Sequence, residues 1–364
     1  MSKRICFLVR HLNDGHSGGA ELQVLLYSRA LVQRGWEVWV MGEGFSAKNG
    51  ITQIEGVRYV LLPPRKRGLG FLNYTYIKTA LKKIHPHVCY QRVKLDYTYW
   101  MARLARRLNI KSLFAFSSEH ECIPGTLAGT QGDLVSRFVS ALADQGIRKV
   151  DLLLCQTEDQ KKLVRANFTR DAVVIKNGHP LPGVKKEISN EPPEVVWVNH
   201  LKPVKQPELF FKLAAVLEEE NAVFTMVGAR GAYTSDERFA QTKRPPNLDV
   251  LGELSLAQVN ERLWGCRLVV NTSRAEGFPN TFIQAWARFV PVVSLRVDPD
   301  GVIAKHQLGF CSGDFSRMVS HTRTLIQEPD IAAEMGRNGR VYVEQEHDLA
   351  ENARKLDQTL QQLI

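Results

Sequence analysis

The sequence predicts two doubly wound α/β domains in tandem, and three observations lead to that expectation. Short apolar runs alternate with amphipathic stretches through the first half of the chain. A polar stretch with a Pro-Pro pair, "GVKKEISNEPPE" at 183–194, interrupts this alternation, which then begins again. The chain, at 364 residues, is also longer than one hydrophobic core usually serves. We therefore expect one domain over residues 1–183 and a second over 184–348.

The expected strands are apolar runs bounded by polar residues, glycine or proline. Near-continuous apolar strands that alternate with helices indicate parallel sheets covered on both faces. The helical stretch "AELQVLLYSRALVQRG" ends at Gly35, as a C-terminal cap would. The tail "DLAENARKLDQTLQQLI" has helical spacing, so a helix over 349–364 should cross back to the first domain. The expected strands are "RICFLV", "EVWVMG", "VRYVLL", "HVCYQR", "SLFAFS" and "DLLLCQ", then "VVWVNH", "AVFTMVG", "LDVLGE", "RLVVNTS", "PVVSLR" and "GFCSG".

The net charge of +10 is unevenly distributed. Residues 1–183 hold 27 Lys and Arg against 14 Asp and Glu, a balance of +13, whereas residues 184–364 hold 21 against 24, a balance of −3. A basic half suits an anionic partner. The six cysteines form no CxxC pair, which favours reduced thiols and no metal cluster. No segment is apolar over the length of a bilayer, so we expect a cytoplasmic protein that is at most peripheral on the inner face of the membrane.

Ligands of open α/β sheets bind beyond the carboxyl ends of the strands, where helix N-termini suit phosphate. The first domain has one such loop, "HLNDGHSGGAELQ" at 11–23, in which Gly18 and Gly19 let the backbone approach a ligand closely. Gly-Gly is also common in plain turns. Neither GxGxxG nor GxxxxGK[ST] occurs, which argues against a dehydrogenase or a P-loop nucleotidase.

The second domain has a stronger candidate in "RAEGFPNTFIQAW" at 274–286. Gly277 and Pro279 allow a sharp turn that lifts Glu276 over the sheet edge, and Asn280 or Thr281 should cap the helix that follows. A phosphate would repel this carboxylate, but neutral hydroxyls beside a phosphate would bind it strongly. The combination indicates a sugar nucleotide.

Three further polar residues each have two interpretations. Gln284 fits a capping box with Thr281, and it could equally contact a ligand. His200 and Lys205 lie at and after the end of "VVWVNH". His200 ends that run, and Lys205 lies five residues further on. Each is either a solvated residue or a ligand contact, and the position at the carboxyl end of a strand favours the second interpretation.

Taken together, these residues resemble the retaining glycosyltransferases of family four, which have the GT-B fold. The resemblance rests on Gly-Gly-Ala-Glu at 18–21, on "VIKNGHPLP" around Asn177, and on Glu-Gly-Phe-Pro from Glu276. It extends over nearly the whole chain, and the last segment is its most specific part. It implies two Rossmann-like domains facing a cleft, the first on the acceptor side and the second binding the nucleotide sugar.

The resemblance also implies roles for individual residues. Glu276 would hold hydroxyls of the transferred sugar, and Lys205 would neutralise the diphosphate leaving group. His120, in "SSEHECIPG", would be the histidine that family members often place beside that sugar, unless it is a surface loop histidine. Other donor contacts would come from Gly18 and Gly19 at the diphosphate, from Gly252 and Leu254 beside the base, and from the backbone of Phe278, Pro279, Asn280 and Thr281.

Two positions depart from the family pattern. His200 stands where the family usually has an arginine, and histidine is often neutral near pH 7 and cannot make a two-pronged phosphate contact. Gln284 replaces the second glutamate, which contacts the nucleotide ribose in the family. Its amide can still bond to ribose hydroxyls, but without the charge.

The implied reaction moves a sugar from a nucleoside diphosphate, with UDP- or GDP-sugar as the expected donor, to a hydroxyl of a glycan or lipid-linked glycan. No second carboxylate is placed as a nucleophile, and a same-face displacement needs only positioning and charge stabilisation. Asp-Pro-Asp at 298–300 is followed by Gly301 and is interpreted as a turn. We therefore expect no metal ion and no cofactor.

Two other function classes remain. A sugar-nucleotide epimerase or hydrolase could use the same scaffold, and a non-catalytic protein could bind an anionic surface through the basic half. We expect an anionic membrane rather than nucleic acid at that half. The segment "PPRKRGLGFLNYTYIK" at 63–78 combines cations with aromatic residues, as interfacial segments do. The apolar stripe within 99–111 should instead pack in the domain core.

Overall fold

The computed structural model describes residues 2–12, 18–44, 52–65, 70–126, 134–183, 192–228 and 244–364. The chain forms two compact units: unit 1 is Met1–Gly178 with Leu349–Ile364, and unit 2 is His179–Asp348. The first junction precedes the expected boundary at 183/184. The reason is that both backbone groups of Gly178 bond to the Gln23 side chain in unit 1, whereas His179 N donates to His347 O in unit 2.

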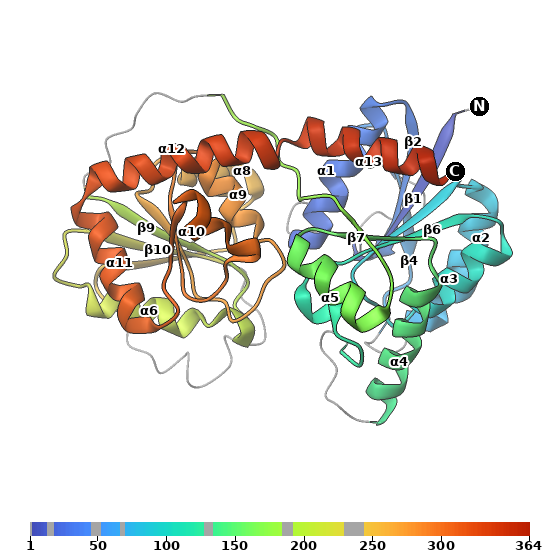
Figure 1. The fold of residues 1–364 in the computed structure, drawn as a ribbon, viewed down its shortest axis with the longest axis horizontal. Helices are drawn as coiled ribbons and strands as arrows, with labels where there is room; N and C mark the ends of the chain where they lie inside the picture. The colour runs from blue at the N-terminus through green and yellow to red at the C-terminus, as the bar shows by residue number, and fades with distance from the viewer. Residues whose placement is uncertain are drawn as a thin grey trace. The chain divides into compact units, whose positions relative to one another are not determined.

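Unit 1 contains an eight-stranded sheet in the order β3-β4-β2-β1-β5-β6-β7-β8 (Figure 1). Its neighbouring strands are parallel, as expected, apart from the short edge strand β3, which the sequence did not predict and which runs antiparallel to β4. Strands β3 and β8 have three and two residues, too few to leave an apolar pattern in the sequence. The strands are β1 (Lys3–His11), β2 (Trp36–Glu43), β3 (Thr52–Ile54), β4 (Val57–Leu62), β5 (Val88–Arg92), β6 (Lys111–Ala115), β7 (Leu152–Cys155) and β8 (Val173–Val174).

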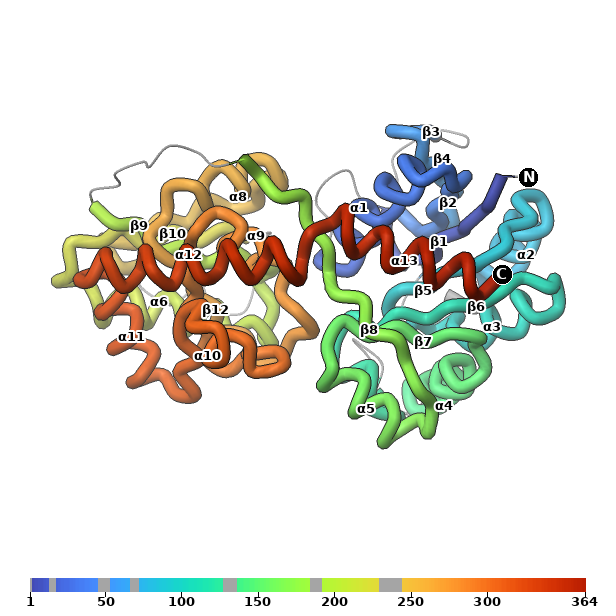
Figure 2. Tube along the Cα trace, turned by 45° about the horizontal axis from the view of Figure 1, so that its top comes forward, coloured from blue at the N-terminus to red at the C-terminus, as the bar shows by residue number. Residues whose placement is uncertain are grey.

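Helices cover both faces of the unit 1 sheet. Ile5 and Phe7 of β1 pack towards α1 and α13, whereas Cys6 and Leu8 point to the opposite face, towards α2, α3 and α5. The C-terminal helix α13 therefore crosses back to the first unit, as expected (Figure 2). The helices are α1 (Gly19–Gln33), α2 (Tyr74–Ile84), α3 (Thr98–Arg107), α4 (Leu134–Lys149), α5 (Glu158–Phe168) and α13 (Leu349–Leu363).

Unit 2 contains a six-stranded parallel sheet in the order β11-β10-β9-β12-β13-β14. Helices α6 and α11 pack on one face, and α8, α9 and α10 pack on the other. The strands are β9 (Glu194–Val198), β10 (Val223–Val227), β11 (Leu248–Gly252), β12 (Leu268–Asn271), β13 (Val292–Ser294) and β14 (Gly309–Cys311). The helices are α6 (Pro207–Val216), α8 (Leu256–Leu263), α9 (Asn280–Trp286), α10 (Val302–His306), α11 (Phe315–Gln327) and α12 (Pro329–Glu346).

Each sheet has one point at which the chain reverses its direction of progress across the strands. In unit 1 this switch point lies between β1 and β5, and in unit 2 it lies between β9 and β12. Loops that leave two such strands diverge to opposite faces, which opens a crevice at their carboxyl ends. The strand order therefore assigns one candidate ligand position to each unit.

Two glycines let helix α12 pack closely against the end of α9 and the segment that follows it. A Cβ atom on Gly336 would lie 1.9 Å from the backbone oxygen of Phe289, and one on Gly339 would lie 2.7 Å from the Trp286 ring. Backbone atoms cannot move aside cheaply, so any side chain at Gly336 would push α12 away from α9.

We predict that Gly336→Ala lowers the free energy of unfolding by about 1–3 kcal/mol, because overpacking outweighs the gain of about 1 kcal/mol in helix propensity. Urea denaturation followed by circular dichroism measures the change. Gly183→Ala is the control, since a Cβ there would meet nothing within 4 Å. Superimposable curves for Gly336→Ala and the parent protein would contradict this account of the packing.

Candidate active site

Two loops meet at the switch point of unit 2, and main-chain groups hold them together. The first follows β9 and includes a 3-10 turn, Pro203–Lys205. The second follows β12. Thr272 Oγ1 donates to the backbone oxygen of Lys205 at 2.6 Å, and Arg274 N donates to the backbone oxygen of Val204 at 2.9 Å. The two loops therefore keep a fixed spacing before any of their charged side chains interact.

The side chains of Lys205 and Glu276 form an ion pair across these loops. Each side chain is only 15% exposed, so the pair is partly shielded from water. Ser273 Oγ donates to Glu276 Oε1 at 2.7 Å, and Asn199 Nδ2 lies 3.5 Å from the same oxygen. Among the described residues, none donates a hydrogen bond to Oε2. One carboxylate oxygen is thus available to a further donor.

The sequence pointed to Glu276 and Lys205 separately but not to their contact. It also missed Asn199 and Ser273, which orient the carboxylate. Both lie near the carboxyl ends of the runs "VVWVNH" and "RLVVNTS" that were expected to be strands, and this position was the available signal. Ordinary polar loop residues share that place, and the sequence does not distinguish them.

His200 is half-buried beside this pair. Burial lowers the pKa of its imidazole, and the charges of Lys202 and Lys205 lower it further, against an opposing effect of Glu253 and Glu276. The ring is therefore neutral at pH 7 and offers one N–H donor rather than a positive charge. Glu253, which lies between Gly252 and Leu254, is close enough to act on this pKa, so the loop after β11 lies near His200.

The start of α9 differs from the expected cap. The N-cap residue is Pro279, and neither Asn280 nor Thr281 caps the helix through its side chain. The capping box is therefore wrong: Gln284 Nε2 donates to Asn260 Oδ1 of α8 at 2.9 Å. Gln284 is 4% exposed. A buried amide needs a hydrogen-bond partner within the protein, and core packing orients this one towards α8. Its contact with a ribose stays a prediction.

Two other residues of the turn, Phe278 and Asn280, are held by contacts with histidines of unit 2. The Phe278 ring packs against His347 at a centroid distance of 4.4 Å, so Phe278 can offer a ligand only its backbone. The Asn280 Oδ1 atom lies 3.0 Å from Nε2 of His179, a contact that the sequence did not indicate. Nε2 donates to Asn280 Oδ1 in the tautomer that carries the ring proton on Nε2. The Asn280 Nδ2 group takes no part in this contact.

Gly18, Gly19 and His120 belong to unit 1. Gly18 is the N-cap residue of α1, which begins at Gly19, while residues 13–17 of that loop lie outside the described residues. His120 is exposed on a short 3-10 helix, Glu119–Cys122, in the loop that follows β6. These three residues therefore belong to unit 1, whereas Lys205 and Glu276 belong to unit 2.

The Asp-Pro-Asp segment forms a turn, as expected. Pro299–Gly301 is a 3-10 turn, and Asp298 Oδ1 accepts a hydrogen bond from Ile303 N at 2.8 Å at the start of α10. Over the described ranges, no three or more His, Cys, Asp or Glu residues are grouped as a metal site would need. Metal independence itself stays a prediction.

Family models match both units. The model "Glycosyltransferase Family 4" covers residues 17–181, and "Glycosyl transferases group 1" covers residues 184–342. The chain belongs to the family 4, or group 1, glycosyltransferases. Its two Rossmann-like sheets are those of a GT-B glycosyltransferase.

Solved structures agree with this glycosyltransferase fold over the full chain. Sucrose-phosphate synthase of Thermosynechococcus elongatus is 15% identical, with 99% of each chain covered and a TM-score of 0.83. HepE of Anabaena, in complex with UDP and glucose, is 16% identical, with 99% of this chain and 100% of that chain covered and a TM-score of 0.76. An E. coli trehalose-6-phosphate structure bound with UDP-2-fluoro glucose is 12% identical, with full coverage of both chains and a TM-score of 0.69. At these identities the likeness establishes the fold alone.

We predict that His179 makes the stability of this glycosyltransferase fall in mild acid. Burial lowers the pKa of His179 from 6.5 to about 4. Between these values the unfolded chain binds the proton and the folded chain does not, so stability is present above pH 6.5 and is lost as pH falls towards 4, by about 3 kcal/mol in full.

The test compares the parent protein with His179→Gln, which keeps a donor for Asn280 but does not titrate. The loss of unfolding free energy between pH 7 and pH 4.5, measured in urea, should be about 2 kcal/mol smaller in the variant. Other titrating groups are common to both proteins and cancel. An equal loss would mean that His179 is protonated in the folded state.

Proposed function

We propose that the protein transfers a sugar from a nucleoside-diphosphate sugar to a hydroxyl of a glycan or lipid-linked glycan, with retained anomeric configuration and without a metal ion. The observation that carries the proposal is the Lys205–Glu276 pair at the unit 2 switch point, with Glu276 Oε2 available to a donor such as a sugar hydroxyl. A lysine beside that carboxylate supplies the counter-charge that a diphosphate needs.

Each side chain has a separate task in this proposal. Glu276 accepts hydrogen bonds from sugar hydroxyls, and Lys205 exchanges its carboxylate partner for an oxygen of the diphosphate. The bond from the sugar C1 to the diphosphate oxygen breaks, and a bond from C1 to the acceptor oxygen forms on the same face. The acceptor proton passes to the departing phosphate oxygen. This step needs positioning and charge stabilisation rather than a nucleophilic side chain.

The donor is inferred to be a UDP-sugar first and a GDP-sugar second. Two proteins that share the fold have UDP or a UDP-sugar analogue in their structures, which supports this order of testing. The remaining expected contacts follow from position: Gly252 and Leu254 at the base, Gln284 at the ribose, and the backbone of residues 278–281 at the diphosphate. His200 supplies a neutral hydrogen bond where an arginine would supply charge.

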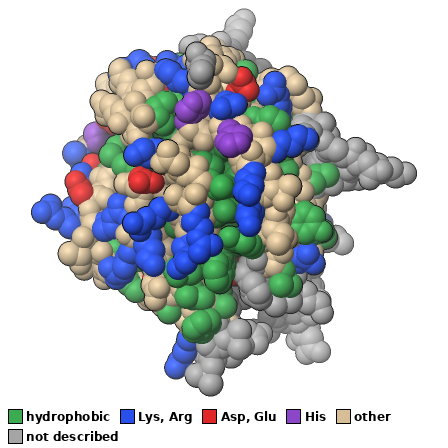
Figure 3. All heavy atoms as spheres, turned by 90° about the vertical axis from the view of Figure 1, so that its right-hand side faces the viewer, with side chains coloured by type: hydrophobic (Ala, Val, Ile, Leu, Met, Phe, Trp, Pro, Cys, Tyr) green, Lys and Arg blue, Asp and Glu red, His purple; other side chains and the backbone are tan. Residues whose placement is uncertain are grey.

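The acceptor is inferred to lie at an anionic membrane surface, and α2 and α3 form the proposed contact. We call their exposed cations the cationic face: Lys78, Lys82 and Lys83 of α2 with Arg103, Arg106 and Arg107 of α3. Figure 3 shows Lys and Arg side chains outnumbering acids on this side of unit 1, with hydrophobic side chains between them.

The apolar residues near the cationic face divide into two groups. Leu72 and Tyr76 are 46% and 50% exposed, which suits insertion between lipid headgroups. Met101 and Leu104 of α3 are instead buried in the core, as the sequence predicted for residues 99–111. Along the described ranges, no helix is both long and apolar enough to span a bilayer.

We predict that Glu276→Gln lowers the transfer rate at least about a hundredfold, because the neutral amide accepts weaker hydrogen bonds from sugar hydroxyls. The donor is first chosen by a thermal-shift screen of UDP-, GDP- and ADP-sugars, and product formation is then assayed with and without a chelator. Stability should fall by about 1–3 kcal/mol, because Lys205 loses its counter-charge in a largely shielded place, and the rate is therefore measured on folded protein.

Glu334→Gln, on the exposed face of α12, removes the same charge outside the site and should leave the rate unchanged. Wild-type activity in Glu276→Gln would reject the assignment of this carboxylate. Loss of parent activity in the chelator would reject metal independence. Free nucleoside diphosphate released without any acceptor would favour the hydrolase alternative.

We predict that Lys78→Gln, Lys82→Gln and Lys83→Gln together weaken binding to anionic vesicles about a hundredfold, at about 1 kcal/mol for each charge. Vesicle sedimentation at low and high salt measures the binding, with neutral vesicles alongside. A triple variant at Lys305, Arg337 and Arg317, all exposed in unit 2, removes equal charge and should bind normally. Binding that ignores lipid charge and salt would exclude the membrane and leave a free glycan acceptor.

A further inference from the structure

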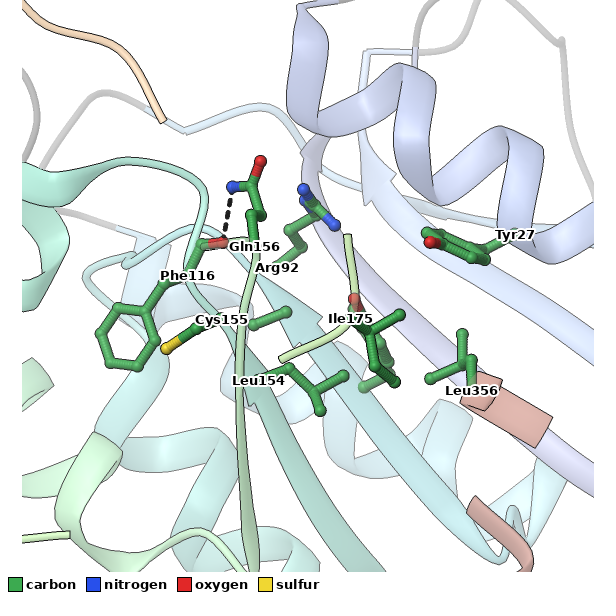
Figure 4. Close-up of a pocket in the computed structure, with 10 residues that line it drawn as sticks. Tyr27, Arg92, Phe116, Leu154, Cys155, Gln156, Ile175 and Leu356 are labelled. Atoms are coloured by element: carbon green, nitrogen blue, oxygen red, sulfur yellow. Dashed lines mark hydrogen bonds between the residues drawn. The ribbon is translucent and has the colours of Figure 1, made fainter. Parts of the chain in front are cut away.

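Unit 1 has a hollow beyond the carboxyl ends of β5, β6 and β7 that contains a buried arginine (Figure 4). In this view the Arg92 guanidinium stands between the side chains of Gln156 and Tyr27 and points away from the sheet. The apolar part of the lining comes from Leu154, Ile175 and Leu356. The hollow has about 240 Å³ of space outside the protein atoms, which is below the usual range for a whole small-molecule site, so it suits one charged group of a ligand rather than the entire ligand.

Arg92 is 4% exposed, yet its charge is not neutralised by a carboxylate. Its Nη2 atom donates to Asn177 Oδ1 at 2.8 Å, while the buried Nε–H has no hydrogen-bond partner. Within the described ranges, no Asp or Glu lies at ion-pair distance from it. A buried cation without an anionic partner is costly, so its retention calls for a physical reason.

The groups around Arg92 do not supply the missing charge. Burial raises the pKa of both Tyr27 and Tyr90, so their hydroxyls are neutral at pH 7. Burial raises the pKa of Glu121, which disfavours its charged form, and its two carboxylate oxygens accept bonds from Ser117 N at 2.6 Å and from Lys94 N at 3.0 Å rather than from Arg92. The positive charge in the hollow is therefore available to a ligand.

The place of Arg92 in the fold also suits a ligand. Arg92 ends β5, and β5 pairs with β1, so Arg92 lies at the switch point of the unit 1 sheet. The loop that leaves β1 leads to Gly18 and Gly19 at the start of α1. This is the position at which open α/β sheets bind their ligands.

We propose that Arg92 binds an oxyanion of the acceptor, a phosphate or a carboxylate, so that the acceptor is an anionic sugar or lipid-linked sugar rather than a neutral one. The inference rests on the proposed transferase function and narrows its acceptor. Guanidinium pairs with either oxyanion through two parallel hydrogen bonds, and the apolar walls strengthen the attraction. Arg92 would thereby fix the position of the acceptor and take no part in the transfer step itself.

The alternative is that Arg92 only holds Asn177 next to the junction of the two units. Titration with inorganic phosphate, and with acetate as the carboxylate probe, separates the two interpretations, because only an anion site would bind these ions. The measurement needs no turnover. The titration uses the full-length Lys205→Ala protein, because this change removes the other proposed anion position. Isothermal calorimetry and amide NMR shifts report the binding.

In that background, Arg92→Gln should weaken phosphate binding at least about tenfold, the size expected for losing a charge-assisted hydrogen bond. Arg165→Gln, an exposed arginine of α5, is the matched control and should bind as the parent does. If Arg92→Gln does not fold, Arg92→Lys keeps the charge but loses the two-pronged contact and should bind several-fold more weakly. Equal binding in the parent and the folded Arg92 variant, or no binding by the parent, would overturn the proposal.

The acceptor is then tested with matched sugars that carry or lack a phosphate or a carboxylate. The parent should show a lower KM for the anionic member of each pair, and Arg92→Lys should lose that preference without losing donor binding. A preference for phosphate over carboxylate identifies the source of the oxyanion, and a preference that persists in Arg92→Lys would overturn the proposal. Failure of the parent to transfer any sugar would reject the transferase function, while the phosphate titration would still decide the anion site.

Discussion

The candidate site depends on the contact between Lys205 and Glu276, and that contact depends in turn on two hydrogen bonds that join the loops after β9 and β12. Because parallel strands end at one edge of the sheet, residues far apart in the chain come within reach of each other there. In the absence of a ligand, the lysine and the carboxylate neutralise each other, so neither charge is left unpaired in a partly shielded place. A ligand that brings both an oxyanion and hydroxyl groups can replace each partner.

Two polar side chains predicted at this site carry no charge. His200 is neutral because it is half-buried beside two lysines, and Gln284 is an uncharged amide bonded to Asn260. Within the described residues, Lys205 is the cation that contacts Glu276 directly. Oriented dipoles, such as backbone N–H groups, can complement a single cation where water is partly excluded.

Unit 1 repeats the same geometry with different chemistry. Its switch point lies beside a buried arginine, and the same residue bonds to Asn177 just before the chain enters unit 2. Gln23 of α1 holds the next residue, Gly178, with two hydrogen bonds of 3.0 and 3.1 Å. Buried polar side chains thus fix the segment that leaves unit 1. One of them, Arg92, also lines the hollow that we assign to an anion.

The sequence by itself determined the two α/β units, the long strands, the returning C-terminal helix and the turn at Glu276, because apolar periodicity and glycine or proline positions are local signals. It did not determine the edge strand β3 or the partner of Gln284. A capping box is a local pattern, but packing turned this amide towards α8, where burial required it to bond to Asn260. The Lys205–Glu276 contact and the uncompensated charge of Arg92 likewise belong to the tertiary structure alone. The first depends on which residues the order of the strands brings together, and the second depends on which buried groups lack a partner. A local stretch of sequence contains neither kind of information.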